Sequence, residues 1–194
     1  NALLETVDLS SLATVGSYID IGSNPLLSSI GAPKFGNLVN VGGYLYLTHT
    51  AIPGHLDLSK LTTVNALLLN YNSAITSIDA SNLPSTNGVV QLYDNAVLQT
   101  ADFSSVTSTA SYVHIEVNPV LKTVNLASLA TVSAGYLKIK VNALLETVDL
   151  PSLTTVGTYI DIQSNPLLNS IGAPKFGNLV SVGGYLYLYD TVIP

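Results

Sequence analysis

The sequence predicts an all-β solenoid, a right-handed coil of about eight turns built from short parallel strands. One motif carries this prediction. Within residues 18–27, the apolar Ile19 and Ile21 alternate with polar neighbours, and Asn24 follows at a fixed offset. Such alternation is typical of a strand with one buried face. The motif recurs every 22–26 residues along the whole chain, which is the signature of a repeat architecture.

Each unit contains two alternating stretches, Val7-x-Leu9 and Ile19-x-Ile21 in the first unit. We expect two parallel sheets on opposite sides of a flattened coil, with Leu12 and Val15 filling the connection between them. The predicted core therefore consists of Leu4, Val7, Leu9, Leu12, Val15, Ile19, Ile21 and their equivalents. The units begin at Asn1, Asn24, Thr50, Asn72, Asn95, Asn118, Asn142 and Asn165, and a ninth starts at Thr191.

Two units are longer than the others because residues 30–38 and 171–179 replace the second alternating stretch with a loop rich in Gly and Pro. Gly and Pro indicate a turn that bulges from the coil, and Pro cannot donate a hydrogen bond to a sheet. We therefore expect the second sheet to be interrupted at these two units.

The amino-acid composition disfavours several classes of function. The chain has 194 residues, of which 47% are hydrophobic and only 9% are charged, with a net charge of −6. All six basic residues are lysines, which disfavours a nucleic-acid partner because such partners are commonly bound by arginine. Cysteine is absent, so the sequence offers neither disulfides nor a thiolate metal site. No apolar run reaches the ~18 residues of a membrane span, so we expect no membrane insertion.

The chain also contains a second, longer repeat in addition to the units of 22–26 residues. Residues 142–194 near-duplicate residues 1–53, with only nine differing positions. Most of the differing positions are expected to face solvent or to lie in turns. We expect residues 1–194 to form a single solenoid that is a segment of a longer array, since neither end carries the polar cap that solenoids need for solubility.

The segment Ile19-x-Ile21-x-x-Asn24-x-Leu26 resembles the L-x-L-x-x-N-x-L signature of leucine-rich repeats. With Leu12-x-x-Val15 before the strand, the unit is similar to receptor-L-domain repeats, which occur in receptor ectodomains, fungal cell-wall proteins and bacterial surface proteins. The resemblance implies a coil with parallel strands and an extracellular or cell-surface location. The chain departs from receptor ectodomains in lacking cysteine-rich caps, and its near-duplication is more typical of microbial repeat proteins.

The repeated Asn is expected to be structural, because a buried side-chain amide at a corner can bond to backbone groups of adjacent coils. Glycosylation is the alternative, but no Asn lies in an Asn-x-Ser/Thr sequon. These structural residues are Asn24, Asn72, Asn95, Asn118, Asn142 and Asn165.

A tyrosine precedes the first strand in most units, and stacking of these rings would stabilise neighbouring strands. Tyrosines also contact sugars and proteins. The candidate partner-binding residues are Tyr44, Tyr46, Tyr185, Tyr187 and Tyr189. On the same face, Lys138 is expected beside Asp161 and His114, and Lys140 beside Glu116, as ordinary cross-strand charge pairs.

An acidic column follows the second stretch, at Asp8, Asp57, Asp79, Asp102 and Asp149. One interpretation is solvation together with Asx-type bonds to the backbone that follows. The other is calcium bridging Asp57, Asp79 and Asp102, although calcium needs six to eight oxygen ligands. Ice binding by the neighbouring Ser/Thr column and a metal site at His49 and His55 are weaker alternatives.

No order of residues typical of catalysis is found, so we expect that the protein is not an enzyme and needs no cofactor. The leading hypothesis is a structural extracellular repeat protein, part of a cell-surface stalk, sheath or filament that can also be adhesive. Its partner would be itself, through continuation of the array or end-to-end assembly. The alternative is a glycan- or protein-binding module that uses the tyrosine-bearing strand face.

Overall fold

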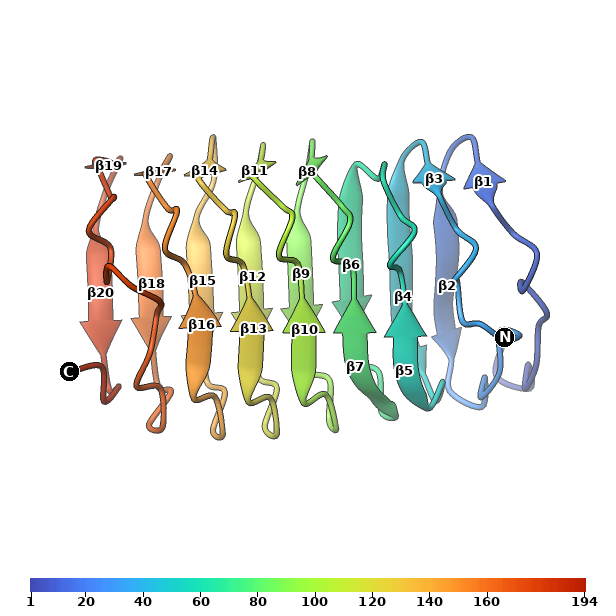
Figure 1. Ribbon diagram of the computed structural model, residues 1–194. Helices are drawn as coiled ribbons and strands as arrows, with labels where there is room; N and C mark the ends of the chain where they lie inside the picture. Colours follow the sequence, from blue (N-terminus) through green and yellow to red (C-terminus); the bar gives the residue numbers. More distant parts are fainter.

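The computed structural model describes residues 1–194 and confirms the all-β solenoid, a coil of about eight turns with parallel strands and no helix. Figure 1 shows the coils side by side in a single row, from the N-terminal coil in blue to the last coil in red. The structure has no helix long and apolar enough to span a membrane.

The predicted Ile19-x-Ile21 stretches form one parallel sheet of eight strands, here called the long sheet. Adjacent coils are in register, so that Leu45 lies opposite Leu67 and Leu47 opposite Leu69. Apolar residues in every second position point into the core, as period-2 alternation requires. The strands are β2 (Ile19–Asn24), β4 (Tyr44–Thr50), β6 (Ala66–Asn70), β9 (Val90–Tyr93), β12 (Val113–Glu116), β15 (Leu137–Lys140), β18 (Ile160–Gln163) and β20 (Leu186–Tyr189).

The second predicted sheet is also present, and it is interrupted where the sequence indicates. The two long units contribute only isolated bridges, Thr6 with Ser29 and Thr147 with Ser170. The stretch Val7-x-Leu9 therefore forms no regular strand, because its neighbouring coil carries the Gly/Pro loop. The second sheet consists of β5 (Gly54–Asp57), β7 (Ile75–Asp79), β10 (Thr100–Asp102), β13 (Thr123–Asn125) and β16 (Thr147–Asp149).

The expectation of two sheets is incomplete, because a third set of strands lies in the connection that Leu12 and Val15 were expected only to fill. These strands have two residues each, too few to show an alternating pattern in the sequence. Five pair in one sheet, and β1 pairs separately with β3. They are β1 (Thr14–Val15), β3 (Asn40–Val41), β8 (Ser85–Thr86), β11 (Ser108–Thr109), β14 (Thr131–Val132), β17 (Thr155–Val156) and β19 (Ser181–Val182).

The core is one continuous cluster of 43 buried hydrophobic residues along the solenoid. In the first coil only Ile19 of the predicted core residues is buried, while the other six are partly buried against the cluster. The reason is geometric: an interior coil is covered on two sides and an end coil on one.

Each coil of the long sheet ends in a left-handed residue directly before the repeated Asn or Thr. Non-glycine residues take this conformation, with φ between 52° and 59°, in all eight coils. Val117 and Val141 are the least expected among them, since β-branched residues are disfavoured at positive φ. The full column is Ser23, His49, Tyr71, Asp94, Val117, Val141, Ser164 and Asp190.

Candidate functional site

The repeated Asn side chains form a ladder inside the corner that follows the long sheet. In the central coils the Oδ1 atom of each Asn accepts the backbone N–H and the Nδ2–H of the Asn one coil earlier. Asn95 donates both bonds to Asn118 at 3.1 Å, and Asn95 Nδ2 also donates to the Leu69 carbonyl at 2.9 Å. The ladder continues through Asn142 to Asn165. Each amide thereby pairs backbone groups that the left-handed corner leaves without sheet partners.

The ladder changes at its N-terminal end. Thr50 takes the place of Asn and donates its Oγ1–H to Asn72 Oδ1 at 2.8 Å. Asn24 is buried and donates to the Gly22 carbonyl, but its Oδ1 has no hydrogen-bond partner. The amides from Asn72 to Asn165 are therefore bonded through both side-chain atoms, whereas the Oδ1 atom of Asn24 is not bonded.

The tyrosines that precede the long sheet stack on one another across the coils. The ring centroids of Tyr112, Tyr136 and Tyr159 are 4.8 Å apart with interplanar angles of 2–3°. Tyr159 stacks on Tyr185 at 4.6 Å, and Tyr18 stacks on Tyr44 at 4.8 Å. The spacing matches that of paired parallel strands, so the sheet itself sets the stack.

A longer path of rings joins this stack to residues that the sequence does not indicate as part of an aromatic surface. His49 stacks on Tyr71 at 4.4 Å, and Tyr71 contacts Tyr93 at 5.3 Å. Tyr93 then meets His114 at 5.9 Å, and His114 lies edge-on to the Tyr112–Tyr136 stack. No single column of the repeat contains these rings, and only the three-dimensional register brings them together. We call the surface from His49 to Tyr187 the aromatic path.

The five tyrosines selected from the sequence fall into two groups at opposite ends of the face. Tyr44 and Tyr46 pack edge-on at 6.5 Å and, with Asp20 and Leu68, line an open hollow of about 300 Å³. Tyr185 and Tyr187 lie 4.5 Å apart at the end of the aromatic path. Tyr189 is 69% exposed on the edge strand β20. The structure thus offers one hollow and one flat aromatic edge.

Charged residues interrupt the aromatic path at one point. Glu116 lies opposite Lys140 in the register, but its carboxylate binds Lys138 Nζ at 2.7 Å and His114 Nε2 at 2.6 Å. Lys140 is therefore the cross-strand neighbour of Glu116, as expected, but the ion pair forms with the diagonal Lys138 instead. Burial opposes ionisation of Glu116, but hydrogen bonds from Lys138 and His114 outweigh it and lower the Glu116 pKa.

Three of the stacked tyrosines, Tyr112, Tyr136 and Tyr159, have raised pKa values. Burial raises the pKa of Tyr136 to about 12, and the neighbouring Tyr112, Tyr159 and Glu116 add to the effect. Burial is also the largest cause of the raised pKa values of Tyr112 and Tyr159. At neutral pH this surface therefore presents neutral phenol rings with hydroxyl groups. One of these, Tyr112, donates its hydroxyl hydrogen to Gln91 Oε1 at 3.1 Å.

The acidic column lies at the carboxyl end of the second sheet, where the register pairs Asp57 with Asp79 and Asp79 with Asp102. Four of the carboxylates accept the backbone N–H two residues later, as in Asp79 with Ser81 at 2.9 Å. Asp149 cannot do so, because Pro151 has no N–H. For Asp57, burial opposes ionisation, but the hydroxyl and N–H of Ser59 prevail and lower its pKa. The structure contains no group of three or more His, Cys, Asp or Glu side chains that could hold a metal ion.

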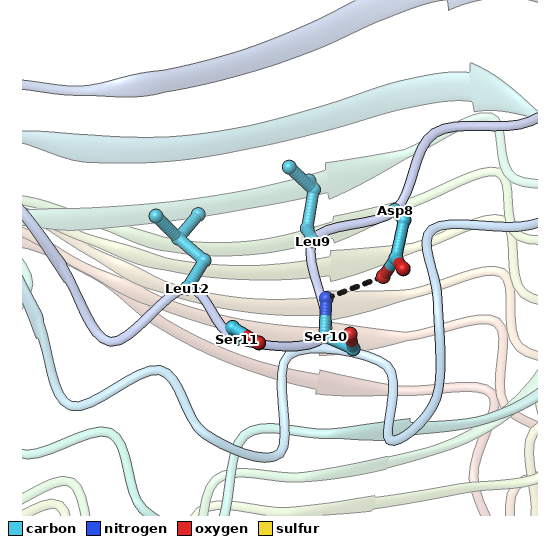
Figure 2. Close-up of a pocket in the computed structure, with 5 residues that line it drawn as sticks. All are labelled: Asp8, Leu9, Ser10, Ser11 and Leu12. Atoms are coloured by element: carbon cyan, nitrogen blue, oxygen red, sulfur yellow. Dashed lines mark hydrogen bonds between the residues drawn. The ribbon is translucent and has the colours of Figure 1, made fainter.

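A second hollow, of about 350 Å³, opens on the first coil and is lined by residues 8–12. Figure 2 shows Asp8 turned toward the Ser10 N–H, while Leu9 and Leu12 point to the other side. The Asp8–Ser10 bond is 2.9 Å long and lowers the Asp8 pKa. In the near-duplicate, Leu150 and Leu153 occupy the positions of Leu9 and Leu12 and are buried. This hollow therefore reflects the one-sided packing of an end coil.

Comparisons with protein-family models, curated proteins and solved structures found no match for this chain.

Proposed function

We propose that this chain is a stretch of a structural, extracellular repeat protein that forms part of a cell-surface stalk, sheath or filament. The near-duplication of residues 1–53 and 142–194 carries the proposal. The copies keep Asn24 and Asn165, Tyr18 and Tyr159, and every apolar core position, whereas their nine differences spare the core. This pattern fits a protein whose function depends on coils that stack alike.

The ladders support the same proposal. Neighbouring coils pair through their strands and, in most of the solenoid, through Asn amides and Tyr rings, and these contacts do not depend on the length of the solenoid. Length can therefore grow without any change to the core. We also propose that the coils are of the leucine-rich-repeat type, in which the Asn of Ile19-x-Ile21-x-x-Asn24 has the corner position described above.

The test is the length and location of the native polypeptide. We expect a mass well above the 20.3 kDa of this chain and surface labelling of intact cells by an antibody raised against it. A mature product of this mass that stays monomeric at high concentration and is not labelled on intact cells would contradict the proposal.

A second candidate, glycan or protein binding, is favoured by the aromatic path and by the hollow at Tyr44 and Tyr46. Phenol rings offer apolar faces to pyranose C–H groups, and their hydroxyls bond to sugar hydroxyls. Asp20 adds a carboxylate acceptor at the rim of the hollow. Binding on this face would add adhesion to the structural role.

A glycan array tests this candidate. Wild-type protein is expected to bind a defined set of glycans, and Tyr46→Ala to lose most of that binding with unchanged circular dichroism. The triple change of Tyr185, Tyr187 and Tyr189 to Ala tests the other end of the face. Val97→Ala, at an exposed position away from both groups, is the matched control. An array that stays blank for the wild type would remove this candidate.

A further inference from the structure

The outer face of the last coil carries apolar side chains that pack against the preceding coil and are not covered on the other side. Leu186 and Leu188 on β20 are 46% and 44% exposed. Their duplicates on β4, Leu45 and Leu47, are completely buried. The sequence around both pairs is Gly-Gly-Tyr-Leu-Tyr-Leu, so the difference arises only from what lies on the far side of the strand.

The near-duplication identifies what covers this surface in the interior. β4 pairs on its C-terminal side with β6, placing Leu67 against Leu45 and Leu69 against Leu47. At the corner beyond β6, Asn72 Nδ2 donates to the Leu47 carbonyl at 3.0 Å, and Asn72 Oδ1 accepts from Thr50 at 2.8 Å. One coil, residues 54–76, therefore supplies both the apolar cover and the polar bonds.

The last coil repeats each group that this contact uses. Leu188 occupies the position of Leu47, and Thr191 occupies the position of Thr50. Gly184, like Gly43, lies at the position whose carbonyl accepts the Asn65 N–H at 2.7 Å in the interior copy. Three nearby residues, Tyr189, Asp190 and Val192, differ from their interior counterparts Thr48, His49 and Ala51. Of these counterparts only Thr48 is buried.

We propose that the outer face of residues 165–194 binds a coil with the sequence of residues 54–76. The inference deepens the proposed function and rests on it. It names the partner of this face by sequence, and it predicts that the unit order of the array repeats every 141 residues.

A second copy of the chain fits this face less well. Its free end would be the first coil, whose residues 1–4 occupy the same part of a unit as residues 191–194. Head-to-tail docking would therefore require two segments to share one place. The first coil also brings Gly22 opposite Tyr189, whereas in the chain Gly22 pairs with Thr48 and Tyr189 with Gln163.

The absence of cysteine allows a direct test by thiol labelling. Leu188→Cys is introduced into the chain and into an extended chain in which a second copy of residues 54–141 follows Pro194. We expect the thiol to react rapidly in the first protein and at least about 100-fold more slowly in the second, because access then requires local opening of the covering coil. Leu47→Cys in the unextended chain gives the reference for full protection.

The matched control is the extended chain with the appended copies of Leu67 and Leu69 both changed to Asp, in which the thiol should react as fast as in the unextended chain. An unprotected thiol in the parent extension, including one caused by an appended segment that stays unfolded, would overturn the inference. Protection of Leu188→Cys in the unextended chain at high concentration would instead identify a second copy as the occupant. Neither result depends on native length or location, so the proposed function can fail or stand separately.

Discussion

Residues 1–53 and residues 142–194 have nearly the same sequence and lie in different surroundings. Leu45 and Leu47 are buried in the first copy, and their counterparts Leu186 and Leu188 are half-exposed in the second. The reverse holds at the start of each copy, where Leu150 is buried and Leu9 only partly so. The local sequence therefore determines the path of a coil, while its neighbours determine how much of it is buried.

The largest expected difference concerns a charge placed in each copy of the same strand. Leu47→Asp buries an unpaired carboxylate between two coils and should lower the free energy of unfolding by more than about 4 kcal/mol. Leu188→Asp leaves the carboxylate in contact with water and should cost about 1 kcal/mol or less. Urea unfolding monitored by circular dichroism checks both values. Equal losses would show that burial in the two copies does not differ.

The Asn ladder allows the same comparison with a polar group. Asn165 Oδ1 accepts the Asn142 backbone N–H at 3.0 Å and its Nδ2–H at 3.2 Å, whereas Asn24 Oδ1 accepts no bond. Asn165→Ala leaves buried donors without partners and should cost about 2–4 kcal/mol, since each such group costs about 1–3 kcal/mol. Asn24→Ala should cost about 1 kcal/mol. Chemical denaturation of the two variants measures the difference, and a larger loss for Asn24→Ala would contradict it.

The stacked tyrosines make the interior coils sensitive to alkaline pH. Because the pKa of Tyr136 is raised from 10.0 to about 12, the folded state binds this proton more tightly than the unfolded state. The contribution of this pKa difference to the free energy of unfolding is complete below pH 10 and is therefore lost as the pH rises toward 12. Tyr136→Phe should show a shallower loss over this range than the wild type. Parallel pH profiles, or a steeper one for Tyr136→Phe, would contradict the assigned cause.

The smallest expected effect concerns the left-handed corner residue Val141, which directly precedes Asn142. Val141 holds φ at 56° with a 43% exposed side chain, so replacing it sacrifices little burial. Val141→Asn should raise the free energy of unfolding by about 0.5–1 kcal/mol, because Asn tolerates this conformation better than a β-branched residue. Val97→Asn, at a position of normal φ, is the control and should give no gain. Thermal unfolding of both variants checks the sign.

Much of the fold could be predicted from the sequence because the repeat states the same pattern many times. Alternation such as Ile19-x-Ile21 predicts the long sheet, and the Gly/Pro loops predict the interruption of the second. The third sheet could not be predicted, since strands such as Thr131–Val132 are too short for a period to show. The left-handed corners could not be predicted either, because β-branched residues such as Val117 and Val141 are disfavoured at positive φ. Only the hydrogen-bonded ladder around these residues explains their conformation.

The candidate site was predicted less completely than the fold. Tyr44 and Tyr185 could be selected because a Tyr recurs at that position in most units, and Tyr46 and Tyr187 because they lie beside them in the two near-duplicate units. His49, Tyr71 and Tyr93 occupy positions where other units carry other residues, so no column indicates them. Their contacts depend on side-chain directions at the corner. The ion pair of Glu116 with Lys138, in place of Lys140, has the same origin in side-chain reach.

Hydrogen exchange at matched amides tests whether neighbours determine the stability of each coil. In the interior, the amide of the first core-facing residue of a long-sheet strand donates to the following coil, as Ile160 does to the Tyr185 carbonyl at 3.0 Å. Leu186 begins β20, the strand at the edge of the long sheet, and Leu45 is its duplicate. We predict that the Leu45 amide exchanges at least about 100-fold more slowly than that of Leu186 under native conditions. Equal exchange rates for this pair would contradict the account.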